Sequence, residues 1–303
     1  MSSIYDRGRA ALVDLSHIGN LKSHSLEVAS VCAWVSTLAY ALVPDAGARS
    51  VEWIPHRELA EALAGGSSPP SAAAWFRERD YPSFTVAVPG GGALGVRIGD
   101  TLLLGFRGTT NGDDWRQINF FTGAGVLPLK VPVLGNRYWP WERGQPVAHG
   151  GFYGIARMLA AAAAPEIAKW RGMGAERLLL CGHSLGGALA LLAGSELEDV
   201  DSIYSYGAPK VGSADLIQYL PESHFRYVFA GDPVPATPPL MDFVHGVPAV
   251  MLRHGGPSPG VLGKLLKGWS KGGSKGALAN LFAAEHDLGL YASTIDAMLA
   301  QGK

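Results

Sequence analysis

The spacing of apolar residues in the first half of the chain predicts one helix and three strands. Apolar positions recur at helical spacing over 26–42, and Ser25 stands where a helix N-cap is expected. Three strand patterns follow, at 84–88, 94–98 and 101–106. Turn residues rich in glycine separate them, so we expect an antiparallel meander. A long stretch, roughly 108–148, shows neither period.

The second half of the chain alternates helix and strand patterns. In order, we expect helix 151–171, strand 177–181, helix 185–197, strand 202–206, a short helix 214–220, strands 225–230 and 247–252, and a final helix 291–299. Such alternation is typical of βαβ units, whose strands are parallel. No repeat or linker divides the sequence, so a single domain over 1–303 is expected.

Charge and composition exclude some classes of protein. The 303 residues are 48% hydrophobic, and the formal net charge of -1 gives no global reason to expect nucleic acid as a partner. No apolar run reaches the roughly 18 residues that span a bilayer. The first residues lack the pattern of a cleavable secretory signal. We therefore expect a soluble or peripheral protein; its location stays open between the cytoplasm and export by a signal-less route.

The two cysteines, Cys32 and Cys181, lie in apolar segments. Their spacing matches neither a zinc site nor a disulfide framework, so both are expected to be buried thiols. A Cys32–Cys181 disulfide is the alternative. No G-x-G-x-x-G motif follows a strand, and no metal, nucleotide or redox cofactor is expected.

A candidate nucleophile lies at Ser184, in a segment that matches G-x-S-x-G. An apolar strand precedes it and a helix pattern follows it, which is the context of a nucleophile elbow. Gly182 and Gly186 avoid the β-carbons that would clash where strand and helix cross. The backbone N–H of Leu185, at the helix N-terminus, would stabilise an oxyanion. The alternative is a glycine-rich turn with an incidental serine.

Asp232 is the expected acid that orients the base. It directly follows the strand 225–230, and the ligand sites of open α/β sheets gather at the carboxyl ends of strands. Its alternative role is a simple Asp-Pro turn. Three other aspartates are less suited: Asp201 precedes its strand, Asp215 is placed as a helix cap, and Asp242 has no strand before it.

His286 is the expected base. A serine hydroxyl needs a base to take its proton, and the chain order in this kind of site is serine, acid, histidine. His286 comes just before the final helix and fits a loop that packs back on the elbow. His254 is the second choice, and His245 also follows Asp232. His183, inside the elbow, is expected to support it.

Six short motifs stand in order along the chain: Phe106-Arg-Gly-Thr109, His149-Gly-Gly-Phe152, Gly182-His-Ser-Leu-Gly-Gly-Ala188, Tyr206-Gly-Ala-Pro-Lys-Val-Gly212, Gly231-Asp-Pro-Val-Pro235, and His286 ahead of Tyr291. Together they resemble the class 3 lipases, typified by secreted fungal triacylglycerol lipases. The resemblance runs from about Ala29 to Tyr291. It implies an α/β-hydrolase fold, with a central, mostly parallel sheet flanked by helices.

The resemblance also implies site residues. It gives Ser184, Asp232 and His286 as the triad, and Thr109 with Leu185 as the oxyanion hole. The position of Thr109 agrees, because it follows a strand that precedes the elbow.

A rival oxyanion loop is His149-Gly150-Gly151, which is similar to the HGGG-type loop of other esterases. It opens the helix that leads into the elbow strand, as the H-x-G-F of the class 3 lipases does. Arg107 is expected to be structural.

Two segments have apolar faces that could meet lipid. In 111–121, Trp115, Ile118 and Phe121 share helical spacing at the place of the family's lid, with a permanently docked surface helix as the alternative. In 261–271, leucines and Trp269 fall opposite three lysines, the pattern of an interfacial helix. A helix docked on the core is again the alternative.

The sequence thus predicts a serine hydrolase that cleaves carboxylic acyl esters, most simply a lipase working through an acyl-enzyme. Two other functions remain open: a phospholipase acting on membrane lipids, and a non-catalytic α/β-hydrolase relative that serves as a binding module.

Overall fold

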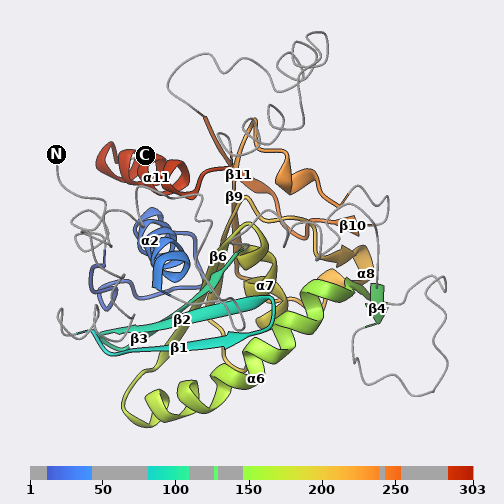
Figure 1. Ribbon diagram of the computed structural model, residues 1–303. Helices are drawn as coiled ribbons and strands as arrows, with labels where there is room; N and C mark the ends of the chain where they lie inside the picture. Colours follow the sequence, from blue (N-terminus) through green and yellow to red (C-terminus); the bar gives the residue numbers. More distant parts are fainter. Residues whose placement is uncertain are drawn as a thin grey trace, which may run out of the picture.

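A seven-stranded sheet organises the computed structural model, which describes residues 12–42, 81–108, 126–128, 146–238, 243–253 and 286–302 (Figure 1). The strand order is β1-β2-β3-β6-β7-β9-β11. The strands are β1 (Ser83–Val88), β2 (Gly91–Ile98), β3 (Thr101–Arg107), β6 (Arg177–His183), β7 (Ser202–Tyr206), β9 (His224–Phe229) and β11 (Ala249–Leu252).

The sheet is antiparallel at one edge and parallel through the rest. β1, β2 and β3 form the expected meander, with Gly92 opposite Arg107. From β3 onward every neighbouring pair is parallel, starting with Thr101 opposite Arg177. All carboxyl ends of the parallel strands therefore lie along one edge of the sheet. The predicted α/β architecture with a mostly parallel sheet is confirmed.

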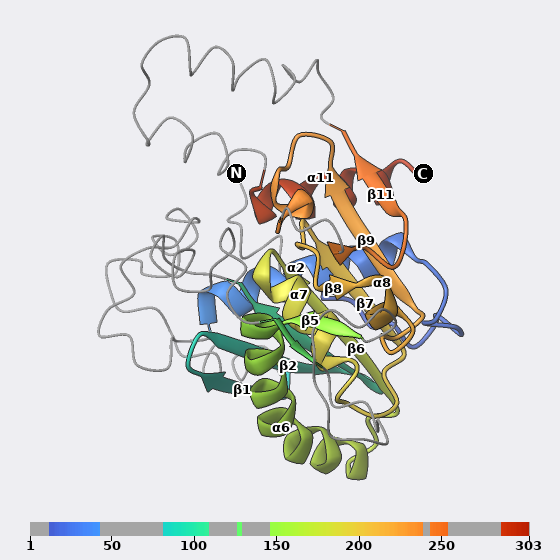
Figure 2. The same cartoon turned by 90° about the vertical axis from the view of Figure 1, so that its right-hand side faces the viewer.

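Helices cover both faces of the sheet (Figures 1 and 2). α2 (Leu26–Leu42) and α11 (Leu288–Ala300) pack on one face, and α6 (Gly150–Gly172) and α7 (Leu185–Ala193) on the other. Successive strand residues point into the two hydrophobic cores in turn: Cys181 and Tyr204 lie in the core with α2, whereas Leu180 and Ile203 lie in the core with α7. Burial of both faces explains why these strands are apolar runs.

Some boundaries differ from the expected ones. β6 continues to His183, two residues beyond the predicted end, because it stays paired with β7. α7 ends at Ala193 instead of 197, since Gly194 takes the C-cap and the Ser195 hydroxyl donates to the Leu192 carbonyl. A second, four-stranded sheet was not expected. Its strands are β10 (Phe243–Val244), β8 (Gly212–Ser213), β5 (Val147–His149) and β4 (Val126–Pro128).

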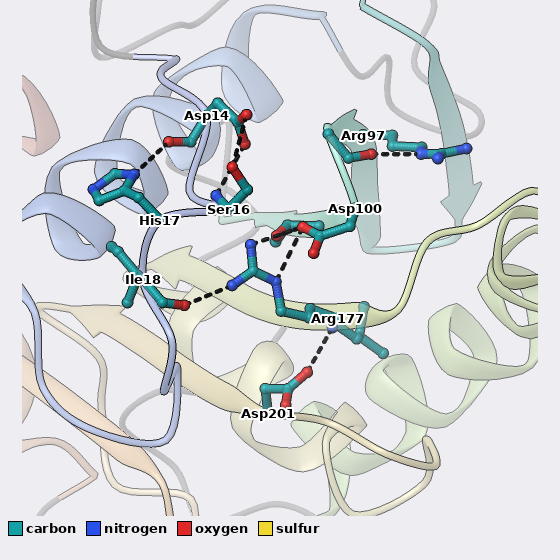
Figure 3. A network of polar contacts seen from close by, with 11 residues as sticks. Asp14, Ser16, His17, Ile18, Arg97, Asp100, Arg177 and Asp201 are labelled. Atoms are coloured by element: carbon teal, nitrogen blue, oxygen red, sulfur yellow. Dashed lines mark hydrogen bonds and ion pairs between the residues drawn. The ribbon is translucent and has the colours of Figure 1, made fainter.

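A polar network fastens the amino end of the parallel strands (Figure 3). The Arg177 guanidinium bonds the Asp100 carboxylate at 2.7 and 3.1 Å and the Ile18 carbonyl at 2.8 Å. Asp201 accepts from the Leu178 amide at 2.8 Å. Asp201 therefore lies at the opposite edge from Ser184, as the sequence predicted.

Both cysteines are buried free thiols, as expected. Among the described residues no helix is long and apolar enough to cross a membrane. The single-domain prediction for 1–303 concerns the whole chain and stays a prediction.

Candidate active site

Ser184 lies on a strained turn between β6 and α7. Its backbone has φ 57° and ψ -130°, a region that non-glycine residues rarely adopt. A β-carbon on Gly182 would overlap the Gly186 carbonyl, and one on Gly186 would overlap the Phe106 carbonyl. Both glycines are thus required by the close crossing of backbone segments. This is the geometry of a nucleophile elbow.

The described residues around Ser184 fix its backbone and make no hydrogen bond to its hydroxyl. The Ser184 amide donates to the Tyr206 carbonyl at 2.9 Å, which fixes the turn against β7. Its Oγ has no hydrogen-bond partner among the described residues, although the side chain is buried. Leu185 begins α7, so its amide belongs to the first turn, where the helix dipole is positive.

Asp232 lies three residues beyond the end of β9 and is buried. Its Oδ1 accepts from the Val234 amide at 2.9 Å. Its Oδ2 accepts two hydrogen bonds, from the Tyr291 hydroxyl and from His286 Nδ1, each at 2.7 Å. Three contacts therefore hold this carboxylate in one orientation.

His286 lies at the end of the segment that leads into α11. Asp287 caps that helix by accepting from the Leu290 amide at 2.9 Å, which anchors the residue next to His286. With Nδ1–H donated to Asp232, the other ring nitrogen, Nε2, is the one that can accept a proton. The His286 ring lies 4.4 Å, centroid to centroid, from the ring of His183, the residue before Ser184. The structure thus brings the predicted acid, base and elbow together.

Gly207 makes a close approach to the acid–base pair. It has φ +57°, and a β-carbon there would lie 2.6 Å from Asp232 Oδ2 and 3.0 Å from His286 Nδ1. The glycine therefore leaves the space that the carboxylate and imidazole occupy. Sequence reasoning missed this role, although the motif from Tyr206 to Gly212 contains the residue.

Tyr291 is a second contact that sequence reasoning did not assign. Its fully buried hydroxyl accepts from the Phe229 amide at 3.1 Å and donates to Asp232. Burial, and then the Asp232 carboxylate, raise the pKa of Tyr291, so the hydroxyl keeps its proton and remains a donor. Its spacing from His286 in the terminal motif was the available signal.

The other candidates lie in different settings. His149 caps α6 by accepting from the Phe152 amide at 3.4 Å, and the two rings stack at 3.9 Å. His245 Nε2 is 2.8 Å from the Pro235 carbonyl. Asp215 lies in the first turn of α8 (Ala214–Ile217). None of these contacts the Asp232–His286 pair in the part of the chain that the structure describes.

Several predicted site residues lie outside the described residues. They are Thr109, the lid residues Trp115, Ile118 and Phe121, the alternatives Asp242 and His254, and the segment 261–271. Within the described ranges, no cluster of three or more His, Cys, Asp or Glu could hold a metal ion.

Comparison with known proteins gives a family match. Residues 103–241 match the model of the family "Lipase (class 3)". The chain is 40% identical over 78 residues to the secreted mono- and diacylglycerol lipase A of Penicillium cyclopium, which covers 23% of this chain and 26% of that protein. It is 33% identical over 105 residues to the toxin TseL of Vibrio cholerae, covering 33% of this chain and 16% of that protein.

A solved structure agrees at the level of the fold. The nonglycosylated LIP2 lipase of Yarrowia lipolytica superposes with a TM-score of 0.51 and 17% identity, over 74% of this chain and 78% of that one. The match to the Penicillium cyclopium lipase spans about a quarter of that relative's length. The α/β-hydrolase fold and the resemblance to the class 3 lipases, over residues 103–241, are therefore confirmed.

Proposed function

We propose that the protein is a lipase that hydrolyses carboxylic acyl esters through Ser184, His286 and Asp232. The observation that carries the proposal is the 2.7 Å bond between His286 Nδ1 and Asp232 Oδ2, beside the strained turn at Ser184. A bond of this kind orients an imidazole and stabilises the imidazolium that forms when it takes a proton. The family match and the lipase relatives support the same reaction class.

The reaction begins with attack of the Ser184 oxygen on the ester carbonyl carbon, while His286 Nε2 takes the hydroxyl proton. The carbonyl oxygen becomes an oxyanion, which the amides of Thr109 and Leu185 stabilise. Collapse of this intermediate expels the alcohol, which receives the proton from His286, and leaves the acyl group on Ser184. Water then repeats the sequence and releases the carboxylic acid.

The substrate class is a lipid ester. Relatives are described as mono- and diacylglycerol and triacylglycerol lipases, which supports an acylglycerol substrate. A phospholipase remains the second candidate because 261–271 carries three lysines opposite an apolar face. The apolar face of 111–121, with Trp115, Ile118 and Phe121, is proposed to cover the site in water and to move on lipid.

The 261–271 segment is proposed to bind anionic lipid surfaces. Replacing Lys264, Lys267 and Lys271 with Gln should weaken binding to anionic vesicles by about 3 kcal/mol, at about 1 kcal/mol per lysine. Hydrolysis of a short soluble ester should hardly change, because the proposed triad is untouched. Binding is measured at low and high salt, with Trp269 emission as the direct signal of insertion. If the triple variant binds vesicles as well as the wild type at low salt, the alternative of a docked surface helix is favoured.

Serine labelling and a substrate panel test the proposed reaction. A fluorophosphonate should label the wild type at Ser184 and leave Ser184→Ala unlabelled. Labelling at another serine, or none, would favour a non-catalytic binding module. A panel of p-nitrophenyl esters from short to long chain, with triacylglycerol and phospholipid, separates the candidates: preferred release of fatty acid from phospholipid would favour the phospholipase.

A further inference from the structure

The hydroxyl of Tyr40 lies where three segments of the site meet. Tyr40 belongs to the last turn of α2 and is 5% exposed. Its Oη is 3.1 Å from His183 Nδ1 and 3.3 Å from the His183 carbonyl oxygen. A β-carbon on Gly108 would overlap this hydroxyl and would lie 2.8 Å from the same carbonyl. One phenol group therefore contacts both the elbow and the exit of β3.

Through Gly108, the Tyr40 hydroxyl is linked to the proposed oxyanion donors. Gly108 directly precedes Thr109, whose amide is one of the two proposed oxyanion donors. Leu185, the other, lies two residues after His183. A hydroxyl held between Gly108 and His183 fixes the spacing of the two chain segments that carry the donors. Oxyanion stabilisation depends on that spacing, because the donors must lie about 3 Å from the oxyanion.

The Tyr40 hydroxyl stays protonated and can donate. Burial raises the pKa of Tyr40, while the Arg107 charge and a hydrogen bond with the Gly108 backbone act in the opposite direction. The hydroxyl has one proton for two acceptors, His183 Nδ1 and the His183 carbonyl, and the tautomer of His183 decides which one receives it. In either arrangement the bond restricts the His183 side chain.

His183 in turn contacts the proposed base. Its ring lies 4.4 Å from that of His286 at an angle of 34°, and 5.7 Å from the ring of Tyr291. It is buried, as is the whole turn around Ser184. Since His286 is attached to the backbone through Cγ and held at Nδ1 by Asp232, its ring can move only by small changes of the χ1 and χ2 torsions. A ring packed on its face limits these changes.

We propose that Tyr40 and His183 form a positioning pair, in which the Tyr40 hydroxyl holds the His183 ring against His286 and keeps the β3 exit at a fixed distance from the elbow. The inference rests on the proposed function, since it assumes that His286 is the base. It assigns no chemical step to either residue: both act through His286 and the oxyanion donors.

A double-mutant cycle on a soluble p-nitrophenyl ester tests the pair. Tyr40→Phe removes only the hydroxyl, and His183→Asn removes the ring while keeping a polar group close to the Tyr40 hydroxyl. Each should lower kcat by about 10- to 100-fold with KM within about twofold, because misplacement of a reacting group by about an ångström costs rate and not binding. Because one of the two roles of the Tyr40 hydroxyl acts through the His183 ring, the double variant should lose less than the product of the two single losses.

Tyr204→Phe is the matched control. Tyr204 is also fully buried, and its hydroxyl accepts from the Ser25 amide at the other end of α2, at 3.2 Å. Its loss should leave kcat within about twofold. A loss equal to that of Tyr40→Phe, a loss confined to KM, or additive losses in the double variant would overturn the proposal. Melting temperatures of all variants identify any change that comes from unfolding.

A spectroscopic measurement separates failure of this inference from failure of the proposed function. The ring proton of His286 between its two nitrogens feels the ring current of His183, and its NMR signal is assigned by its absence in His286→Ala. Tyr40→Phe should shift this signal, and Tyr204→Phe should not. An unshifted signal in Tyr40→Phe overturns the positioning pair whether or not the protein hydrolyses esters. If Ser184→Ala retains full turnover, the proposed function fails. The shift of the His286 signal in Tyr40→Phe still tests the positioning pair in that case.

Discussion

Two serine–histidine pairs of the protein differ in every feature that matters for catalysis. Ser205, in β7, lies 2.8 Å from His224 Nε2, in β9, and both side chains are buried between the sheet and its helices. Ser184 lies at the carboxyl edge of the same sheet, directly after His183, whose ring packs against that of His286. Ser205 shares a hydrogen bond with its histidine, whereas Ser184 Oγ has no hydrogen-bond partner among the described residues. The Ser205 pair nevertheless has no aspartate on the histidine among the described residues and no strained backbone at the serine.

The charge environments of the two histidines explain the difference. Burial, and then the charges of Arg226 and His245, lower the pKa of His224 to about 3. A histidine that cannot become positive cannot serve as a base near neutral pH. His286 instead has its Nδ1 2.7 Å from a carboxylate oxygen of Asp232, the contact that orients the base in the proposed mechanism. A serine–histidine contact is therefore not enough; the acid and the strained turn distinguish the proposed site.

The sharpest way to break this comparison is to remove each serine hydroxyl. Ser184→Ala should lower ester turnover by about 10⁶-fold, as loss of a triad member does. Ser205→Ala, the matched control, should leave turnover within about threefold, although it costs about 1–3 kcal/mol of stability by leaving His224 without its bond. Turnover is measured on folded protein, verified by circular dichroism. Near wild-type turnover in Ser184→Ala would show that Ser184 is not the nucleophile and that the proposed triad is wrong.

The second test removes the charge of the Asp232 carboxylate, which contacts His286 and has no counterpart at His224 among the described residues. Asp232→Asn should keep the fold but favour the wrong tautomer of His286, at a cost of about 10⁴ in turnover. Asp201→Asn is its control, since Asp201 binds the Leu178 amide at the opposite edge of the sheet. If Asp215→Asn or Asp242→Asn is instead the crippling change, Asp232 is not the acid.

Local sequence patterns predicted the positions of Ser184 and Asp232 in the fold. A glycine-flanked serine between an apolar strand and a helix specifies the turn at Ser184, and the strand before Asp232 places that aspartate at the carboxyl edge. The contact between Ser205 and His224 depends on the register of β7 against β9, which no local pattern encodes. The same holds for Tyr40 and Gly207, whose roles arise from long-range packing. The second sheet was missed because its strands are two or three residues long.

The third prediction concerns the proposed oxyanion donors of the Ser184 site. If the Thr109 hydroxyl donates as well as its amide, Thr109→Val should cost roughly 10²–10³ in kcat with little change in KM. The rival loop is tested by Gly151→Ala, a change at an exposed position in the first turn of α6. A greater loss of kcat from Gly151→Ala than from Thr109→Val would favour the rival. A loss confined to KM would assign Thr109 to substrate binding.

The smallest expected effect is on stability and concerns the other pair. His224 has a pKa of about 3 in the folded protein against 6.5 for an ordinary histidine. Below about pH 6.5 the unfolded chain therefore binds a proton at His224 that the folded protein does not yet bind, and the free energy of unfolding falls as the pH drops toward 3. His245, whose pKa burial lowers to about 4, contributes in the same direction.

His224→Gln should reduce the difference in unfolding free energy between pH 7 and pH 4 by about 1–3 kcal/mol, measured by urea denaturation. Ser205→Ala should keep that difference, because burial and not the serine bond is the main cause of the lowered pKa. Equal pH dependence in wild type and His224→Gln would show that burial does not hold His224 neutral, and the contrast with His286 would then rest on the Asp232 carboxylate alone.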